Sequence, residues 1–345
     1  MIMSQFCPRC AEPAATADQF CEGCGAALRV NRSGTVAAAA AGTQRPCHGC
    51  GQPFATQGRL DGEYCPCCGL HRRDGTDHIE IDLGALAGVS DRGHVHVRNE
   101  DAMALGQRVA GKPATLAAVV CDGVSTVHTP ELASRAAAEI ALDILLEADN
   151  APEHTAEDRA HAAVAAADRT VARLPAPGRR GAPCCTLVSA LVNWPEPGRP
   201  EITVAWVGDS RAYWLAGTEA EPARLLTRDH SWAAEMVTAG VLDTATAMAD
   251  ARAHAITQWV GAGSAGEPGV LTLRPAGSGA LMLCSDGLWN YLPGSAELAA
   301  VALPMIEHGT GALKAAAALT AVALERGGRD NITVVVIPIT VRSPS

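Results

Sequence analysis

Residues 280–289, ALMLCSDGLW, join an apolar run of strand length to an Asp-Gly pair. Aspartate is disfavoured inside strands and costly to bury without a partner, so we expect Asp286 in a turn at the end of the strand. Gly287 would let the backbone of that turn come close to a metal ion or a bound water. An isolated Asp-Gly pair is more often a plain turn, so this stretch alone is weak evidence for a functional site. The prediction depends on finding the same pattern elsewhere in the chain.

The same juxtaposition of an acid with an apolar strand recurs at four further places. They are Asp101 in RNEDA (98–102), Asp122 in VVCDGV (119–124), Asp209 in VGDSRAY (207–213) and Asp330 in DNITVVV (330–336). Several carboxylates at strand ends can converge on hard divalent cations, which prefer oxygen ligands. The five aspartates therefore predict a divalent-metal site built from the ends of several strands.

From about residue 79 onward the sequence has the pattern of a globular domain with both strands and helices. Apolar strand-sized segments cover 116–121, 186–192, 202–207, 212–215, 280–284 and 332–339. Ala-rich helical stretches cover 130–147, 153–172, 295–306 and 311–325. Pro130 and Glu131 suit a helix start, because proline fits the first turn and an acid fits the positive end of the helix.

The composition excludes several classes of protein. Of the 345 residues, 48% are hydrophobic, which rules out disorder as the main state. The formal net charge of −10 argues against a nucleic-acid scaffold or a binder of anionic membranes, because both need a basic face. No apolar run reaches the roughly 18 residues that span a bilayer, and MIMSQFCPRC lacks the pattern of a secretory signal. We therefore expect a cytoplasmic protein with no nucleic-acid and no membrane partner.

Two four-cysteine units precede this domain. Each contains two pairs with two residues between the paired cysteines: Cys7 and Cys10 with Cys21 and Cys24, then Cys47 and Cys50 with Cys65 and Cys68. Two such turns complete a tetrahedral shell of four thiolates, which suits Zn²⁺ and a reduced compartment. We expect two structural zinc ions. The alternatives are an iron–sulfur site, redox-active thiols, or Cys67 in place of one ligand.

The paired units resemble double zinc ribbons and set the predicted domain boundaries. Residues 1–28 would form the first ribbon, 29–44 a linker, 45–75 the second ribbon and 79–341 the large domain. The alanine run of the linker is alternatively a short helix. Small units without a core need their metal to fold, so we expect a structural role, or docking of a protein partner, for the ribbons.

The motifs of the large domain together resemble the PP2C (PPM) family of metal-dependent protein phosphatases. The resemblance spans roughly 79–341 and rests on the motifs above with LTRDHSW (226–232), ITQWVG (256–261) and LCSDGLW (283–289), all in family order. It implies an α+β fold, a β-sandwich of two mainly antiparallel sheets flanked by helices. It also implies hydrolysis of phosphoserine or phosphothreonine by a water that two Mn²⁺ or Mg²⁺ ions activate.

The resemblance assigns roles to the acidic residues. Asp122 would bridge two metal ions, with the Gly123 carbonyl ligating one of them, and Asp286 and Asp330 would complete the protein ligands. Asp209 matches the position of a third, weaker metal, with Asp286 as its partner. The predicted catalytic residues are Asp101, Asp122, Asp286 and Asp330, of which the first would reach its metal through water.

The sequence also departs from the family pattern. Members usually carry an Arg five residues before the first-motif Asp, where this chain has His96, so a planar fork is replaced by a partly charged imidazole. Arg98 would share a face with His96 if this segment is a strand, and is the preferred phosphate-binding residue beside it.

Val124 stands where some members have a general-acid His, and we expect His230 to be a structural loop residue. The segment 232–254 is too short for a large substrate-contacting flap.

Two alternatives to a metal-dependent phosphatase stay open at this point. A cysteine phosphatase would need a Cys-x₅-Arg motif, and we instead expect small core residues at the four cysteines that lack it, Cys121, Cys184, Cys185 and Cys284. A phosphatase-like module that binds phosphoproteins with little turnover is favoured by His96, whereas the intact acidic set favours the enzyme. The expected partner is a phosphorylated protein, the substrate of a serine/threonine kinase.

Overall fold

The computed structural model describes residues 77–341 apart from 109–114, 128, 148–154, 177–180, 197, 218–220, 265 and 308–310, together with three short N-terminal strands. These strands are β1 (Ser4–Phe6), β2 (Pro13–Ala15) and β3 (Val30–Arg32). The cysteines of both predicted zinc ribbons, Cys67 included, lie outside the described residues, so the ribbons stay a prediction.

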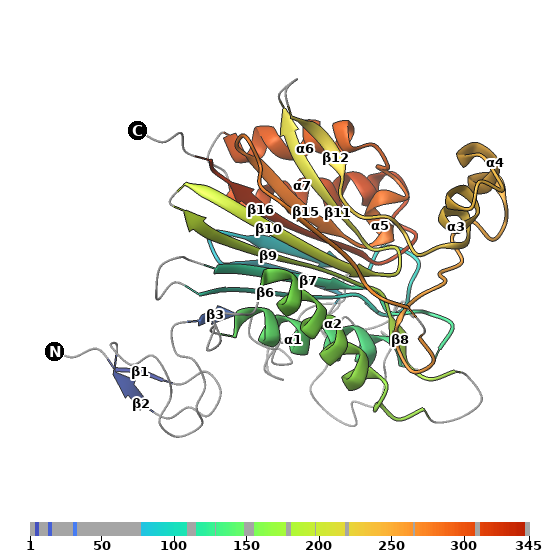
Figure 1. Cartoon of the computed structure of the whole chain (residues 1–345), viewed down its shortest axis with the longest axis horizontal. Coiled ribbons are helices and arrows are strands. Elements are labelled where there is room, and N and C mark those ends of the chain that lie inside the picture. Colours follow the sequence, from blue (N-terminus) through green and yellow to red (C-terminus); the bar gives the residue numbers. More distant parts are fainter. Residues whose placement is uncertain are drawn as a thin grey trace, which may run out of the picture.

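Two six-stranded antiparallel sheets pack face to face (Figure 1). The first contains, in spatial order, β14 (Gly269–Leu273), β10 (Arg199–Val207), β9 (Leu187–Glu196), β7 (Thr115–Cys121), β6 (Ala102–Arg108) and β3. The second contains β12 (Pro222–Leu225), β11 (Arg211–Gly217), β15 (Gly279–Cys284), β16 (Ile332–Ile339), β5 (Ala87–Asp91) and β4 (His78–Asp82). The predicted α+β sandwich of antiparallel sheets is confirmed.

Helices cover both outer faces of the sandwich. The first sheet is covered by α1 (Pro130–Leu146) and α2 (Ala156–Val171), and the second by α6 (Ser295–Glu307) and α7 (Gly311–Glu325). Their bounds agree with the predicted ones to within three residues. Thr155 fixes the start of α2, because its hydroxyl accepts from the backbone of Asp158 while the Asp158 carboxylate accepts from the backbone of Thr155. No helix in the described part of the chain has the length and apolar character needed to cross a membrane.

The core is built from small aliphatic side chains on alternating positions of the strands. In β7, Ala118 and Val120 face the second sheet, whereas Ala117 and Val119 face the helices. This alternation lets one buried strand contribute to two hydrophobic layers. Trp214 is fully buried between the sheets and is the largest of these fully buried side chains.

A small unit of two helices projects from one end of the sandwich (Figure 1). It consists of α3 (Trp232–Thr238) and α4 (Thr244–Ala249), which pack through Ala233, Ala247 and Ala253. The side chains of Ser231 and Asp243 cap the two helices. The segment predicted to be too short for a large flap thus folds into a compact substructure of its own.

The segment predicted as a linker contributes a strand to the large domain. β3 pairs antiparallel with β6, with Val30 opposite Arg108 and Arg32 opposite Gly106. It thereby closes the edge of the first sheet that β6 would otherwise form.

The strand register brings the acidic turns to one end of both sheets. In the second sheet, Cys284 at the end of β15 lies opposite both Arg211, the first residue of β11, and Val334 near the start of β16. In the first sheet, Cys121 at the end of β7 lies opposite Ala102 at the start of β6. The turns before or after these positions carry the predicted aspartates, so antiparallel pairing gathers them without any long connection.

Candidate functional site

Five aspartates gather at this end of the sandwich. Burial raises the pKa of Asp122 well above its ordinary value, and the charges of Asp101, Asp286, Asp209 and Asp330 raise that pKa further. Because all four act on Asp122, the structure brings together the whole acidic set predicted from the sequence.

Burial and like charge also raise the pKa values of Asp101, Asp209 and Asp286. The pKa of Asp101 rises to about 7, mainly through burial and further through the charges of Asp330 and Asp286. The pKa of Asp209 rises to about 8 and that of Asp286 to about 6, again with burial as the largest cause. Carboxylates that are removed from water and placed beside one another are unfavourable unless a cation neutralises them.

A buried chain of polar groups holds Asp101. Ser285 Oγ donates to Asp101 Oδ2 at 2.7 Å and accepts from the backbone N–H of Thr333 at 3.0 Å. The Thr333 hydroxyl lies 2.7 Å from Ser90 Oγ, which accepts from Asn99 Nδ2 at 2.9 Å. Ser285 would lose a buried partner if the carboxylate turned away, so this hydrogen bond fixes the orientation of Asp101.

Asp122 is held through its backbone. Its N–H donates to Thr186 Oγ1 at 3.1 Å, and its carbonyl accepts from the backbone N–H of Thr186 at 2.8 Å. Gly123 follows in close contact with neighbouring backbone, since a Cβ here would lie 2.7 Å from the carbonyl oxygen of Glu100. Packing therefore requires a glycine at position 123, beyond any role of the Gly123 carbonyl as a ligand.

Asn331, the residue after Asp330, holds the loop 92–100 that leads to Asp101. Its Oδ1 accepts from the backbone N–H of Glu100 at 2.7 Å, and its Nδ2 donates to the carbonyls of Arg92 and Arg98 at 2.7 and 3.0 Å. Asn331 is 2% exposed, so these bonds replace all its contacts with water. The turn before Asp101 is thereby tied to the residue after Asp330.

The donor set of the acidic cluster fits a divalent cation. Oδ1 of Asp101 and Oδ1 of Asp286 are buried without a hydrogen-bond partner, whereas Oδ2 of Asp286 accepts from Asn290 Nδ2 at 3.2 Å. Unpaired buried carboxylate oxygens beside other carboxylates are suitable ligands for Mg²⁺ or Mn²⁺. Within the residues that the structure describes, no three His, Cys, Asp or Glu side chains already converge on one point as a complete metal site. The cluster thus supplies ligands without a preformed coordination shell.

The two predicted phosphate-binding residues lie in different surroundings. Residues 92–98 contain a turn at 93–95 and a bend at 97–98 and no strand, so the strand alternation that favoured Arg98 does not apply. His96 Nε2 lies 3.1 Å from Asp330 Oδ1 and so reaches the acidic cluster. Arg98 instead pairs with Glu131 of α1 at 3.4 Å, and 59% of its side chain is exposed.

His230 and the cysteines of the domain have structural surroundings. His230 Nδ1 accepts from the backbone N–H of Gly208 at 3.2 Å, and burial lowers the pKa of His230. Burial raises the pKa of Cys184 to about 11 and that of Cys185 well above its ordinary value, which leaves little thiolate to act as a nucleophile. The free, buried thiols of the described residues are those of Cys121, Cys184, Cys185 and Cys284.

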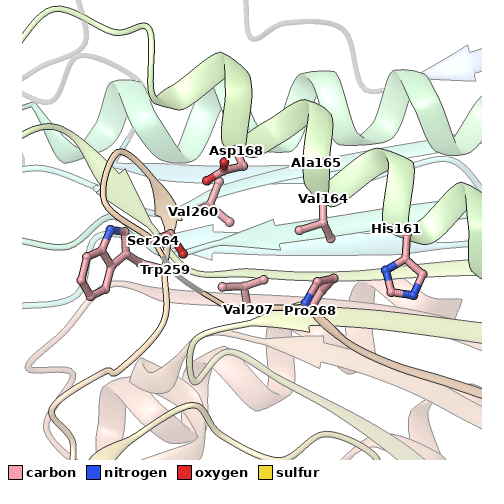
Figure 2. A pocket seen from close by; sticks show the side chains of 10 residues that line it. His161, Val164, Ala165, Asp168, Val207, Trp259, Val260, Ser264 and Pro268 are labelled. Atoms are coloured by element: carbon pink, nitrogen blue, oxygen red, sulfur yellow. The ribbon is translucent and has the colours of Figure 1, made fainter.

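A cavity of about 300 Å³ lies outside the acidic cluster, between α2 and the loop 259–268 (Figure 2). Trp259 and His161 lie at its two ends. Asp168 also lines it, but Asp168 Oδ1 accepts from the backbone N–H of Gly261 at 2.9 Å and so fastens β13 (Val260–Gly261) to α2. This carboxylate has a structural role, and the cavity is not the candidate active site.

Sequence reasoning missed the residues that hold the acidic groups. Ser285, Thr333, Thr186 and Asn331 are all at most 3% exposed. A signal was present, because each is a polar residue in or beside an apolar run, where burial requires a hydrogen-bond partner. The pattern does not say which distant residue that partner is.

Comparisons with known proteins agree with this geometry. No family model matches the chain. The serine/threonine phosphatase stp of Listeria innocua is 32% identical over 152 residues, which cover 44% of this chain and 55% of that protein. The chain thus spans about half the length of the curated relatives it matches. The crystal structure of the serine/threonine phosphatase PstP/Ppp of Mycobacterium tuberculosis has a TM-score of 0.57 and 27% identity, over 74% of this chain and 98% of that one.

A further structural match bears on the metal. The catalytic domain of the serine threonine protein phosphatase PstP, solved in complex with two manganese ions, is 28% identical with a TM-score of 0.53, over 74% of this chain and 98% of that one. The described domain is thus similar in sequence and in fold to serine/threonine phosphatases. In the present chain, the acidic cluster contains buried carboxylate oxygens of the kind that suits such ions.

Proposed function

We propose that the chain is a protein phosphatase that hydrolyses phosphoserine and phosphothreonine with two bound Mn²⁺ or Mg²⁺ ions. The observation that carries this proposal is the buried acidic cluster, in which Asp101 and Asp286 each keep one carboxylate oxygen without a partner. Such a cluster is unfavourable without cations and becomes a ligand set with them. The likeness to phosphatases, one of which was solved with two manganese ions, supports the same reaction.

The metal-binding roles proposed here are those that the resemblance to the PP2C (PPM) family implies. Asp122, Asp286 and Asp330 with the Gly123 carbonyl would hold the two ions, Asp101 would act through water, and Asp209 with Asp286 would hold a third, weaker ion. The bound ions would supply Lewis-acid activation of the attacking water and neutralise charge on the phosphoryl group. The residues around them keep the carboxylates in place for this task, as Ser285 does for Asp101 and Thr186 for the backbone of Asp122.

His96 and Arg98 are the residues proposed to orient the substrate phosphate. The ion pair of His96 with Asp330 supports His96 as the nearer of the two, because Asp330 is on the accessible side of the cluster, with 44% of its side chain exposed. Arg98 would have to leave Glu131 to take part. A single imidazole donates fewer hydrogen bonds than a guanidinium fork, so we expect weak binding of the phosphate group.

Hydrolysis of a phosphothreonine peptide by the full-length chain tests the proposal. The protein is first treated with a chelator and then given Mn²⁺, and Asp286→Asn is measured beside it. We expect turnover that Mn²⁺ restores and that Asp286→Asn lowers by about 100-fold or more. Asp82→Asn is the matched control, because Asp82 is an exposed aspartate of β4 outside the cluster. No turnover by folded, Mn²⁺-loaded protein would contradict the proposed enzyme.

The alternative of a phosphoprotein-binding module with little turnover has no support from the comparisons, since the relatives reported above are named phosphatases. His96 was the feature that favoured it. The contact of His96 with Asp330 ties this residue to the acidic cluster rather than to a separate binding surface.

The N-terminal units are proposed to bind two structural zinc ions through the eight cysteines named above, and to offer a docking site to a protein partner. The CxxC spacing supports this, and reduced thiolate ligands agree with a cytoplasmic location. The metal content of purified protein tests it, with two zinc ions per chain expected. Cys7→Ser with Cys10→Ser should remove one of them, and an unchanged zinc content in that variant would contradict the first site.

A further inference from the structure

Trp289 joins the two turns that carry Asp209 and Asp286. It is the last residue of α5 (Asp286–Trp289) and is 3% exposed. Its indole Nε1–H donates to the backbone carbonyl of Asp209 at 2.9 Å. Asp209 lies between β10 and β11, whereas Asp286 follows β15, so this hydrogen bond directly connects two separate ligand-bearing turns.

Arg211 lies over the face of the same indole. Its guanidinium carbon is 3.7 Å from the centroid of the Trp289 ring. Asp229 holds the guanidinium by two hydrogen bonds, from Nε at 2.9 Å and from Nη2 at 2.7 Å. A planar fork held over an aromatic face resists displacement, because a shift breaks the ion pair and the stacking together.

The two-helix unit α3–α4 reaches the same ring through His254. The ring centroids of His254 and Trp289 are 5.7 Å apart at an interplanar angle of 34°. The neighbouring Ala255 carbonyl accepts from the backbone N–H of Trp232, the first residue of α3, at 2.9 Å. The indole is thus enclosed by the Asp209 turn, by Arg211 and by the projecting unit.

We propose that Trp289, with Arg211 packed on it, is a positioning residue for the divalent-metal site. The pair sets the separation of Asp209 and Asp286, and so the affinity of the ion that these two carboxylates share. The inference rests on the proposed function, since it needs both aspartates to bind a cation. Both residues act through the backbone and the turns, and not by contact with metal or substrate.

A Mn²⁺ titration of the chelated full-length protein tests this role, with free Mn²⁺ followed by electron paramagnetic resonance. Trp289→Phe keeps an aromatic ring but lacks the donor to Asp209. We expect the weakest bound ion to lose affinity by about threefold to tenfold, the effect of one hydrogen bond, while the tighter ions keep theirs. Trp214→Phe is the matched control, because Trp214 is fully buried and its Nε1 has no hydrogen-bond partner. It removes the same indole bulk without removing a hydrogen bond.

Arg211→Lys is the second variant, and it tests the positioning role independently if Trp289→Phe does not fold. Lysine keeps the positive charge but loses the fork to Asp229 and the planar contact with the ring, so the same ion should weaken. Unchanged affinities in both variants would overturn the positioning role and leave the proposed phosphatase intact. Equal weakening in Trp214→Phe would also overturn it, because general loosening would then explain the loss. Wild-type protein that binds no Mn²⁺ would overturn the proposed function, and the positioning role with it.

Discussion

Ser285 Oγ donates a 2.7 Å hydrogen bond to Asp101 Oδ2, so a hydroxyl directly after β15 holds a carboxylate directly before β6. The two strands belong to different sheets of the sandwich. Ser285 is fully buried and also accepts from the backbone N–H of Thr333. The geometry of the acidic cluster therefore depends on how the two sheets close on each other.

Ser285→Ala should lower the free energy of unfolding by about 1–3 kcal/mol, because it leaves a buried carboxylate oxygen and a buried N–H without their partner. Chemical denaturation of the chelated protein measures this change. Ser278→Ala is the matched control: the Ser278 hydroxyl also accepts from a backbone N–H, that of Val341 at 3.0 Å, but it is exposed. Water can replace it there, so we expect a change within about 0.5 kcal/mol. Equal midpoints for the two variants would show that Asp101 does not depend on the Ser285 hydroxyl.

Asp286→Asn should change stability in opposite directions without and with Mn²⁺. Burial and the charge of Asp330 raise the pKa of Asp286 to about 6, so its ionised form is unfavourable in the folded, metal-free protein near pH 8. A neutral amide removes that repulsion, and we expect a higher melting temperature than wild type in chelator. With saturating Mn²⁺ the wild type gains stability because the ion binds the native state, and the variant gains less.

Thermal unfolding of Asp286→Asn and of wild type is measured in chelator and then in Mn²⁺. We expect the variant to have the higher melting temperature in chelator and the wild type to have the higher one in Mn²⁺. A variant that is less stable than wild type by the same amount in both conditions would contradict like-charge repulsion within the cluster. Asp82→Asn again controls for the loss of an aspartate, since it lies on the exposed side of β4 and should respond equally in both conditions.

The aspartates of the cluster were predictable because each follows or precedes an apolar strand, a signal that lies within a few residues of sequence. Asp122 and Asp286 are the clearest cases, with a buried strand before each. The strands at the sheet edges were not predicted, and neither were β5 and β6, each of which lies next to an edge strand. β4 and β14 are short and largely half-exposed, so they lack the continuous apolar run that marked the central strands.

The place of Arg98 could not be obtained from local sequence. The alternation argument assumed a strand, but Asn331 draws residues 92–100 into a turn with hydrogen bonds to three backbone groups. Asn331 lies more than 200 residues away in the chain, and its partners depend on the tertiary fold. The same holds for Ser285 and Asp101, whose contact exists only after the sheets have packed.

The imidazole of His78 gives the domain a small pH-dependent stabilisation away from the acidic cluster. His78 lies opposite Asp91 in the β4–β5 pair, with Nδ1 2.7 Å from Asp91 Oδ2. Partial burial lowers the pKa of His78, but hydrogen bonds to Asp91 and Glu80 outweigh it, and the pKa is raised above 6.5. The stabilisation is therefore complete below pH 6.5 and is lost as the pH rises through the raised pKa.

The free energy of unfolding of wild type and His78→Gln should differ near pH 5.5 by less than about 1 kcal/mol, since the pair is partly exposed, and converge near pH 8.5. Taking the difference between the two proteins at each pH cancels the titration of the acidic cluster, which both share. A difference that grows with rising pH would contradict the ion pair.

Backbone pairing of β3 with β6 makes the N-terminal segment part of the first sheet, next to the strand that begins directly after Asp101. In an antiparallel edge strand, alternate N–H groups point to the neighbour, so only one of Asn31 and Arg32 donates to β6. Proline lacks the N–H. One of Asn31→Pro and Arg32→Pro should therefore speed hydrogen exchange in residues 102–108, and the other is its matched control.

We expect exchange in β6 to rise about threefold to tenfold in the affected variant, the effect of losing about one hydrogen bond, with β15 in the other sheet unchanged. Mass spectrometry of the full-length chain after timed deuteration resolves the two strands as separate peptides. Exchange in β6 that equals wild type in both proline variants would mean that residues 30–32 do not close this edge in solution. Faster exchange in β6 and β15 alike would mean that the substitution loosens the whole sandwich, and the edge would then not be a separate unit of stability.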